Sequence, residues 1–132
     1  MPAKAKPLIA IVDDDESVCR ALSRLVRSLD MNAQTFSSGQ AFLELLEALP
    51  SFRPDCVVLD IQMPGVNGFD VHDQIRTVRT GLPVIFITAF DEGSARERAL
   101  TGGAVAYLRK PFNDAVLAQT LRAALEPGAT EP

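Results

Sequence analysis

An unbroken apolar run, Cys-Val-Val-Leu at residues 56–59, leads directly into the carboxylate of Asp60 and then into a turn rich in proline and glycine. Because the run does not alternate between apolar and polar residues, it predicts a strand buried on both faces, as in a parallel sheet covered by helices. Ligands and reacting groups of such sheets lie at the carboxyl ends of the strands. Asp60 is therefore either a turn-forming residue or a functional group, and by itself the choice between the two is even.

Strand-like and helical segments alternate along the whole chain. Four further strands are predicted at residues 8–12, 32–36, 83–88 and 104–108, the second of them polar enough for a sheet edge. A helix is expected after each strand: the second can be capped by Ser37 or Ser38, the fourth covers residues 91–101, and the last carries Val116 to Leu125. This order predicts an α/β fold, a doubly wound five-stranded parallel sheet with five helices and right-handed crossovers.

Composition narrows the class of protein. The 132 residues suit one domain, expected over residues 1–126, with a flexible tail or the start of a linker at 127–132. The net charge of −4 argues against a direct nucleic-acid surface, and no apolar run is long enough to cross a membrane. Cys19 and Cys56 have no metal-binding spacing, so we expect reduced, buried thiols in a cytoplasmic protein.

The predicted strands deliver a distinctive set of side chains at their carboxyl ends. These are Asp13 and Asp14, Asp60, Thr88, and Lys110. Three carboxylates that meet at one edge cannot all stay ionised unless a cation lies among them, and oxygen ligands without His or Cys favour Mg²⁺. A lysine and a hydroxyl beside such an ion suit the handling of a phosphoryl group, and a carboxylate can itself be the nucleophile.

Four motifs at these strand ends carry a family resemblance. They are Ile-Val-Asp-Asp-Asp at 11–15, Val-Leu-Asp-Ile-Gln-Met-Pro-Gly-Val-Asn-Gly at 58–68, Ile-Thr-Ala at 87–89 and Gly-Ala-Val-Ala-Tyr-Leu-Arg-Lys-Pro-Phe at 103–112. With them, the chain from Leu8 to about Leu125 resembles the receiver domain of two-component response regulators. The resemblance implies the flavodoxin-like strand order 2-1-3-4-5, and a signalling switch that is not an enzyme in the usual sense.

The resemblance also implies a role for each matching residue. Asp60 would accept a phosphoryl group from a sensor histidine kinase. Asp14 and Asp60 would bind Mg²⁺ together with the backbone carbonyl of Gln62, and Asp13 would act through a metal-bound water. Lys110 would pair with the phosphoryl oxygens.

Two further residues would form the switch that the resemblance implies. Thr88 would move toward the phosphate and Tyr107 would turn inward, relaying the change to the face made by the fourth helix, the fifth strand and the fifth helix. A downstream output protein or domain would respond to this change. A cis bond before Pro111 is usual in the family, and a dimer that forms on phosphorylation is left open.

Each residue also has a simpler interpretation. An acid such as Asp15 can stabilise the start of the first helix, Thr88 suits a strand, and Tyr107 is more often a core residue than a switch. The only histidine, His72, is expected on the surface or half-buried in a helix, with no catalytic role. The functional interpretation rests on the joint placement of the residues.

Three rival functions deserve a test. In a phosphatase of the haloacid-dehalogenase type, Asp13-x-Asp15 would be the nucleophile motif, but Asp60 would lose its role. A flavin-binding module of the same topology would need phosphate donors where this chain has three aspartates. A receiver that has lost phosphorylation would bind its partner regardless of Asp60.

Two further hypotheses concern positions around the acceptor. Gln62 and Phe90 lie two residues after Asp60 and Thr88, and the bulky Phe90 is expected to screen an aspartyl phosphate from water. The helix at 91–101 has a thin apolar face, Ala95, Ala99 and Leu100, which predicts a mobile element.

Overall fold

A single parallel sheet forms the centre of the molecule. The computed structural model describes residues 6–89 and 93–126. The strands are β1 (Leu8–Val12), β2 (Asn32–Phe36), β3 (Cys56–Asp60), β4 (Val84–Thr88) and β5 (Ala106–Arg109), in the order β2-β1-β3-β4-β5. All four neighbouring pairs are parallel. The predicted flavodoxin-like fold and strand order are therefore confirmed, and the polar segment 32–36 is indeed an edge strand.

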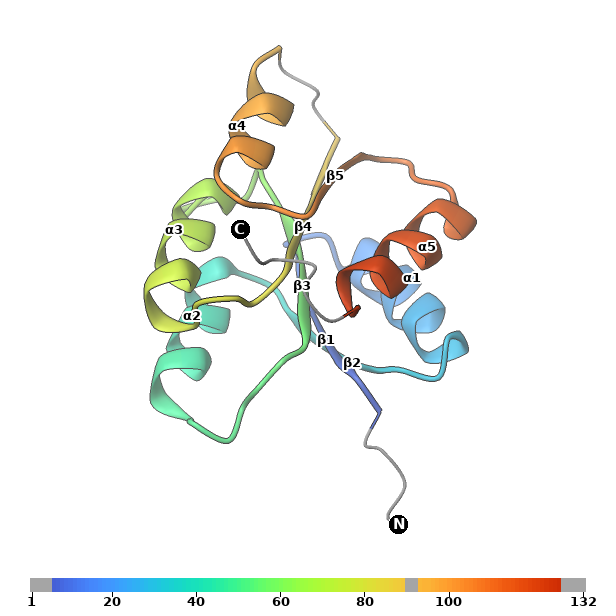
Figure 1. Ribbon diagram of the computed structural model, residues 1–132, viewed down its shortest axis with the longest axis horizontal. Helices are drawn as coiled ribbons and strands as arrows, with labels where there is room; N and C mark the ends of the chain where they lie inside the picture. Colours follow the sequence, from blue (N-terminus) through green and yellow to red (C-terminus); the bar gives the residue numbers. More distant parts are fainter. Residues whose placement is uncertain (1–5, 90–92, 127–132) are drawn as a thin grey trace.

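Helices cover both faces of the sheet. They are α1 (Glu16–Ser28), α2 (Gly39–Ala48), α3 (Gly68–Val78), α4 (Ala95–Thr101) and α5 (Asp114–Ala124). Figure 1 shows α1 and α5 on one side of the sheet and α2, α3 and α4 on the other. The alternation of strands and helices read from the sequence is thus the observed one. The fourth helix, predicted from residue 91, begins at Ala95 because Gly93 and Ser94 form a turn; residues 91 and 92 lie outside the described residues.

The central strands are buried on both faces, as the unbroken apolar runs predict. Every residue of β3 and β4 is buried. Alternate residues of β3 enter different cores: Val57 and Leu59 face the helices α2, α3 and α4, whereas Cys56 and Val58 face α1 and α5. This two-sided burial places the functional groups at the strand ends, where the side chains are no longer needed for the core.

Local hydrogen bonds fix where the helices begin. The side chain of Asp15 accepts from the backbone N–H groups of Ser17 and Val18 and caps α1, as the simpler interpretation of this acid supposed. Ser38, one of the two predicted candidates, caps α2. Asn67 caps α3, which starts directly after the turn that follows Asp60. Each cap satisfies backbone donors that a helix start leaves unpaired.

Two expectations about individual side chains are wrong. His72 is 5% exposed and its ring packs edge-on against Phe86, because its position on α3 faces the sheet. Cys56 is buried as expected, but Cys19 is only half-buried at the side of α1; both are free thiols. Within the described residues, no helix is long and apolar enough to span a membrane.

Candidate functional site

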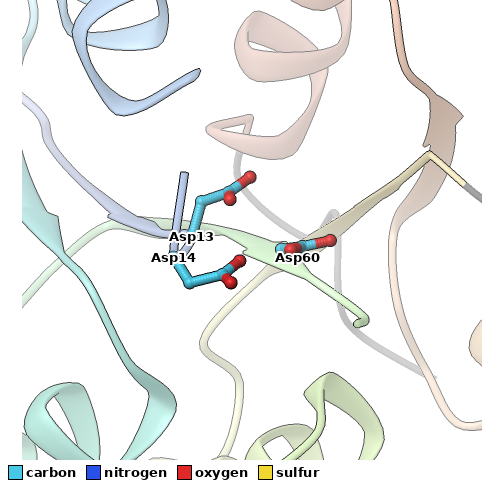
Figure 2. A group of neighbouring side chains, drawn as sticks. All are labelled: Asp13, Asp14 and Asp60. Carbon is cyan, nitrogen blue, oxygen red and sulfur yellow. The ribbon is translucent and has the colours of Figure 1, made fainter. Parts of the chain in front are cut away.

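Three carboxylates from two neighbouring strands meet at one edge of the sheet. Asp13 and Asp14 follow β1, and Asp60 is the last residue of β3, so parallel pairing of these strands brings the groups together (Figure 2). One carboxylate oxygen from each lies within 4.8 Å of the others. Asp13 and Asp60 are 1% and 3% exposed, whereas Asp14 is exposed. The cluster therefore has two buried acids and one side open to solvent.

Lys110 reaches the same cluster from the far strand. Its ammonium nitrogen lies 2.7 Å from Oδ2 of Asp13 and 3.6 Å from Oδ1 of Asp60. The backbone N–H of Lys110 donates to the carbonyl of Thr88 (2.7 Å), which ties the loop after β5 to the end of β4. The Lys110-Pro111 peptide bond is cis, as the resemblance implied.

The charges in the cluster oppose and support one another. Burial, with the nearby charge of Asp13, raises the pKa of Asp60 to about 6, although Lys110 acts in the other direction. Burial also disfavours the charged form of Lys110, but the nearby carboxylates of Asp13 and Asp60 outweigh this effect and raise the pKa of Lys110. The protein alone thus leaves Asp60 short of compensating positive charge.

The donor set fits a hard divalent cation. It consists of oxygen ligands alone, which suits Mg²⁺ and disfavours softer metals. Oδ2 of Asp13 is buried and accepts no hydrogen bond of standard geometry, although the Lys110 ammonium lies beside it. A cation among the three carboxylates would relieve both the crowding of negative charge and the high pKa of Asp60.

The remaining predicted residues take different places around the cluster. The backbone N–H of Gln62 donates to Oδ1 of Asp60 (3.4 Å), so Gln62 lies in the turn directly beyond the acid, with its side chain exposed. Thr88 ends β4 and is fully buried. Tyr107 lies on β5, paired in register with Phe86, and is 3% exposed. Phe90 lies outside the described residues.

Residues that the sequence did not single out also shape this edge. A side-chain carbon added at Gly68 would lie 2.6 Å from the backbone oxygen of Asp60, so only glycine lets α3 begin this close to the acid. Arg96 and Arg98 of α4 lie over the rings of Tyr107 and Phe69. The signal for Gly68 was its place in the turn motif. The two arginines gave no signal beyond the thin apolar face of their helix.

Comparisons with known proteins agree with this arrangement. The family model of the response regulator receiver domain matches residues 9–122. Nodulation protein W of Bradyrhizobium diazoefficiens is 36% identical over 94% of this chain and 53% of its own length, and response regulator MprA of Mycobacterium ulcerans is 40% identical over 89% and 49%. The chain thus spans about half the length of these curated relatives.

Solved structures point the same way. The crystal structure of a response regulator receiver protein from Burkholderia phymatum is 53% identical, with a TM-score of 0.83 over 91% of this chain and 95% of that one. A CheY-like receiver domain from Methanospirillum hungatei shares the fold at 21% identity, with a TM-score of 0.84. The family-model match and these relatives show that the chain belongs to the response regulator receiver domain family of two-component systems.

Proposed function

We propose that this chain is a phosphoryl-accepting switch in the cytoplasm, with Asp60 as the acceptor. The donor would be the phosphohistidine of a sensor histidine kinase. A carboxylate oxygen of Asp60 attacks phosphorus, an O–P bond forms, and the N–P bond breaks with its electron pair returning to the imidazole nitrogen. The observation that carries the proposal is the meeting of Asp13, Asp14, Asp60 and Lys110 at the carboxyl edge of the sheet.

The acids of the cluster would hold Mg²⁺, which when bound supplies positive charge to the carboxylates and to the phosphoryl oxygens. Asp14 and Asp60 would be its side-chain ligands and Gln62 would offer its backbone carbonyl. Asp13 would act through a bound water, in keeping with its ion pair to Lys110. The buried, incompletely neutralised Asp60 and the exposed Asp14 support this division of roles.

Lys110 would hold the phosphoryl oxygens after transfer. Its ammonium group already lies within 3.6 Å of Oδ1 of Asp60, so a small movement away from Asp13 would bring it to the new charge. Thr88 would donate its hydroxyl to a phosphoryl oxygen, because β4 ends beside β3. Charge neutralisation of this kind supplies most of the catalysis in phosphoryl transfer.

Thr88 and Tyr107 would relay phosphorylation to the surface formed by α4, β5 and α5. Thr88 ends β4, and the carbonyl of Thr88 binds the backbone of Lys110 directly after β5, so movement at the acceptor is coupled to both strands. A downstream output protein or domain would respond to this surface. The chain would also assist hydrolysis of its own aspartyl phosphate, which ends the signal.

Intact mass after incubation with acetyl phosphate tests the acceptor. We expect a gain of one phosphoryl group in the wild type, dependent on Mg²⁺ and absent in Asp60→Asn, with Asp114→Asn as an exposed control. No gain in the wild type would favour a receiver that only docks its partner. A gain that survives Asp60→Asn would point to a different acceptor.

The same labelled protein tests the proposed role of Phe90. If its ring screens the aspartyl phosphate from water, Phe90→Glu should speed loss of the phosphoryl group, measured as the decay of the added mass after acetyl phosphate is removed. An unchanged lifetime would show that Phe90 has no such role.

A further inference from the structure

Apolar burial holds α4 only weakly against the rest of the molecule. Ala99 is the one buried residue of this helix, and Leu100 is 42% exposed. The preceding residue, Ser94, makes no side-chain capping hydrogen bond. Most of the attachment of α4 must therefore come from polar contacts at its sides.

Two arginines of α4 supply such contacts to different elements. The guanidinium carbon of Arg96 lies 5.8 Å from the ring centre of Tyr107 on β5, and its Nη1 donates to the Tyr107 carbonyl (3.5 Å). The guanidinium carbon of Arg98 lies 4.2 Å from the ring centre of Phe69 on α3. Both are cation–π contacts. Because residues two apart point to nearly opposite sides of a helix, the arginines hold α4 from both sides.

The two aromatic rings belong to one packed group. Phe69 packs on Phe86 with ring centres 5.2 Å apart, and Phe86 is the register partner of Tyr107 across β4 and β5. Phe86 also precedes Thr88 by two residues on the same strand, so the two side chains share a face of the sheet. Ring contacts therefore join Arg98 to Phe69 and Phe86, and the pairing of β4 with β5 joins Phe86 to Tyr107 and Arg96, so that the path begins and ends on α4.

We propose that Arg96 and Arg98 are positioning residues that couple the seating of α4 to the burial of the Tyr107 ring. While both contacts are made, α4 lies against α3 and β5, and the guanidinium group of Arg96 lies over the ring of Tyr107. If either contact is lost, α4 loosens and the ring of Tyr107 turns outward more often. This inference rests on the proposed function, in which Tyr107 is the switch, and assigns two residues that set its balance.

Coupling through α4 and simple shielding of the Tyr107 ring by Arg96 predict different effects of substituting Arg98. The guanidinium group of Arg98 contacts Phe69 of α3, on the far side of α4 from Tyr107. If α4 and Tyr107 act together, removing the Arg98 side chain must still increase exposure of Tyr107. If Arg96 merely covers the ring, only substitution of Arg96 can do so.

Tyrosine fluorescence measures this directly, because Tyr107 is the only tyrosine and the chain has no tryptophan. Acrylamide quenching would be compared for wild type, Arg96→Met, Arg98→Met and the exposed α5 control Arg122→Met, without Mg²⁺ or any phosphoryl donor. We expect both α4 variants to raise the outward fraction of the ring about two- to fivefold, which is the value of one cation–π contact at an exposed site. Arg122→Met should match wild type, and Arg96→Lys should restore most of the protection.

The outcomes separate cleanly. Unchanged quenching in both α4 variants overturns the proposal, and an increase in Arg96→Met alone overturns the coupling through α4. Circular dichroism checks that each variant is folded. If Arg96→Met does not fold, the comparison of Arg96→Lys with wild type takes its place. Mg²⁺ with beryllofluoride, an analogue of the phosphoryl group, is then added to Arg96→Met. Recovery of protection there supports the link to the acceptor, whereas its absence, with the quenching results intact, counts against the proposed function and not against the coupling.

Discussion

The ammonium group of Lys110 lies closer to Asp13 than to the proposed acceptor Asp60, at 2.7 Å against 3.6 Å. The lysine therefore compensates mainly a neighbouring acid in this state, and Asp60 keeps a raised pKa of about 6. A phosphoryl group on Asp60 would offer Lys110 stronger acceptors than Asp13 does. The unequal pairing thus leaves the cation available for the product of the proposed reaction.

Substitution of Lys110 by Met should have opposite effects on stability and on metal affinity. Without the ammonium group, two buried carboxylates lose their cation, and the metal-free protein should lose about 1–3 kcal/mol of stability. The same change removes positive charge beside the acids and should tighten Mg²⁺ binding. Urea unfolding in EDTA and a Mg²⁺ titration followed by calorimetry would measure both. Weaker Mg²⁺ binding in Lys110→Met would contradict the idea that lysine and metal share one cluster of charge.

Substitution of Asp60 by Asn should stabilise the metal-free protein, and more so as pH rises. The folded-state pKa of Asp60, about 6, lies above its ordinary value of 3.8, so the folded protein binds the proton more tightly than the unfolded chain does. The wild type therefore loses stability as pH rises between these values, and the variant escapes this loss. We expect an advantage of about 1–3 kcal/mol at pH 7 in EDTA that shrinks toward pH 5.

Denaturant unfolding at several pH values checks this, with Glu47→Gln as an exposed control. Mg²⁺ should reduce the advantage of Asp60→Asn, because the ion binds the wild-type carboxylate. If the advantage of Asp60→Asn were independent of pH, ionisation of the buried Asp60 carboxyl would not be its cause.

His72 should make the stability of the folded protein fall in acid, and replacing His72 by Leu should remove this contribution. Burial, and then the charge of Arg76, lowers the pKa of His72 below its ordinary value of 6.5. The unfolded chain therefore binds the proton more readily, and stability is lost as pH falls through 6.5 toward the folded-state pKa. The difference in urea midpoint between wild type and His72→Leu should change between pH 7.5 and pH 5.5, with the wild type losing more. Equal losses of stability in wild type and His72→Leu would mean that the pKa of His72 is the same in the folded and unfolded states.

Gly68→Ala should damage the fold at the acceptor turn. The added carbon would lie 2.6 Å from the Asp60 carbonyl oxygen and 2.7 Å from the Ile61 Cα. Both are backbone atoms, which cannot move away without shifting the chain. We expect a loss of about 1–3 kcal/mol and slower phosphorylation by acetyl phosphate, because the start of α3 must move away from the site. Gly93→Ala is the matched control, since a carbon there meets nothing within 4 Å. Equal stability of the two variants would mean that the turn relaxes without strain.

The sequence by itself determined the order in which strands and helices follow one another along the chain, and which residues stand at the strand ends. Unbroken apolar runs such as residues 56–59 are typical of strands buried on both faces of a covered parallel sheet, and together with the alternation of strands and helices they predict the fold class. The resemblance then supplied the strand order and the expected roles of Asp60 and Lys110. Bounds were close where a turn or cap was clear, as at residues 32–36, and less close for the short β5 (Ala106–Arg109).

Only the tertiary structure decided which side chains meet. His72 has the local pattern of an ordinary helix residue, but the packing of α3 on β4 buries it against Phe86. Nothing in the local sequence assigns a role to Arg96 and Arg98, and their contacts with Tyr107 and Phe69 follow only from the placement of α4. The Lys110 ammonium nitrogen is likewise closer to Asp13 than to Asp60 by less than about 1 Å, a difference that depends on how segments far apart in the chain pack together. Such contacts depend on how distant elements pack, which local periodicity and propensity do not encode.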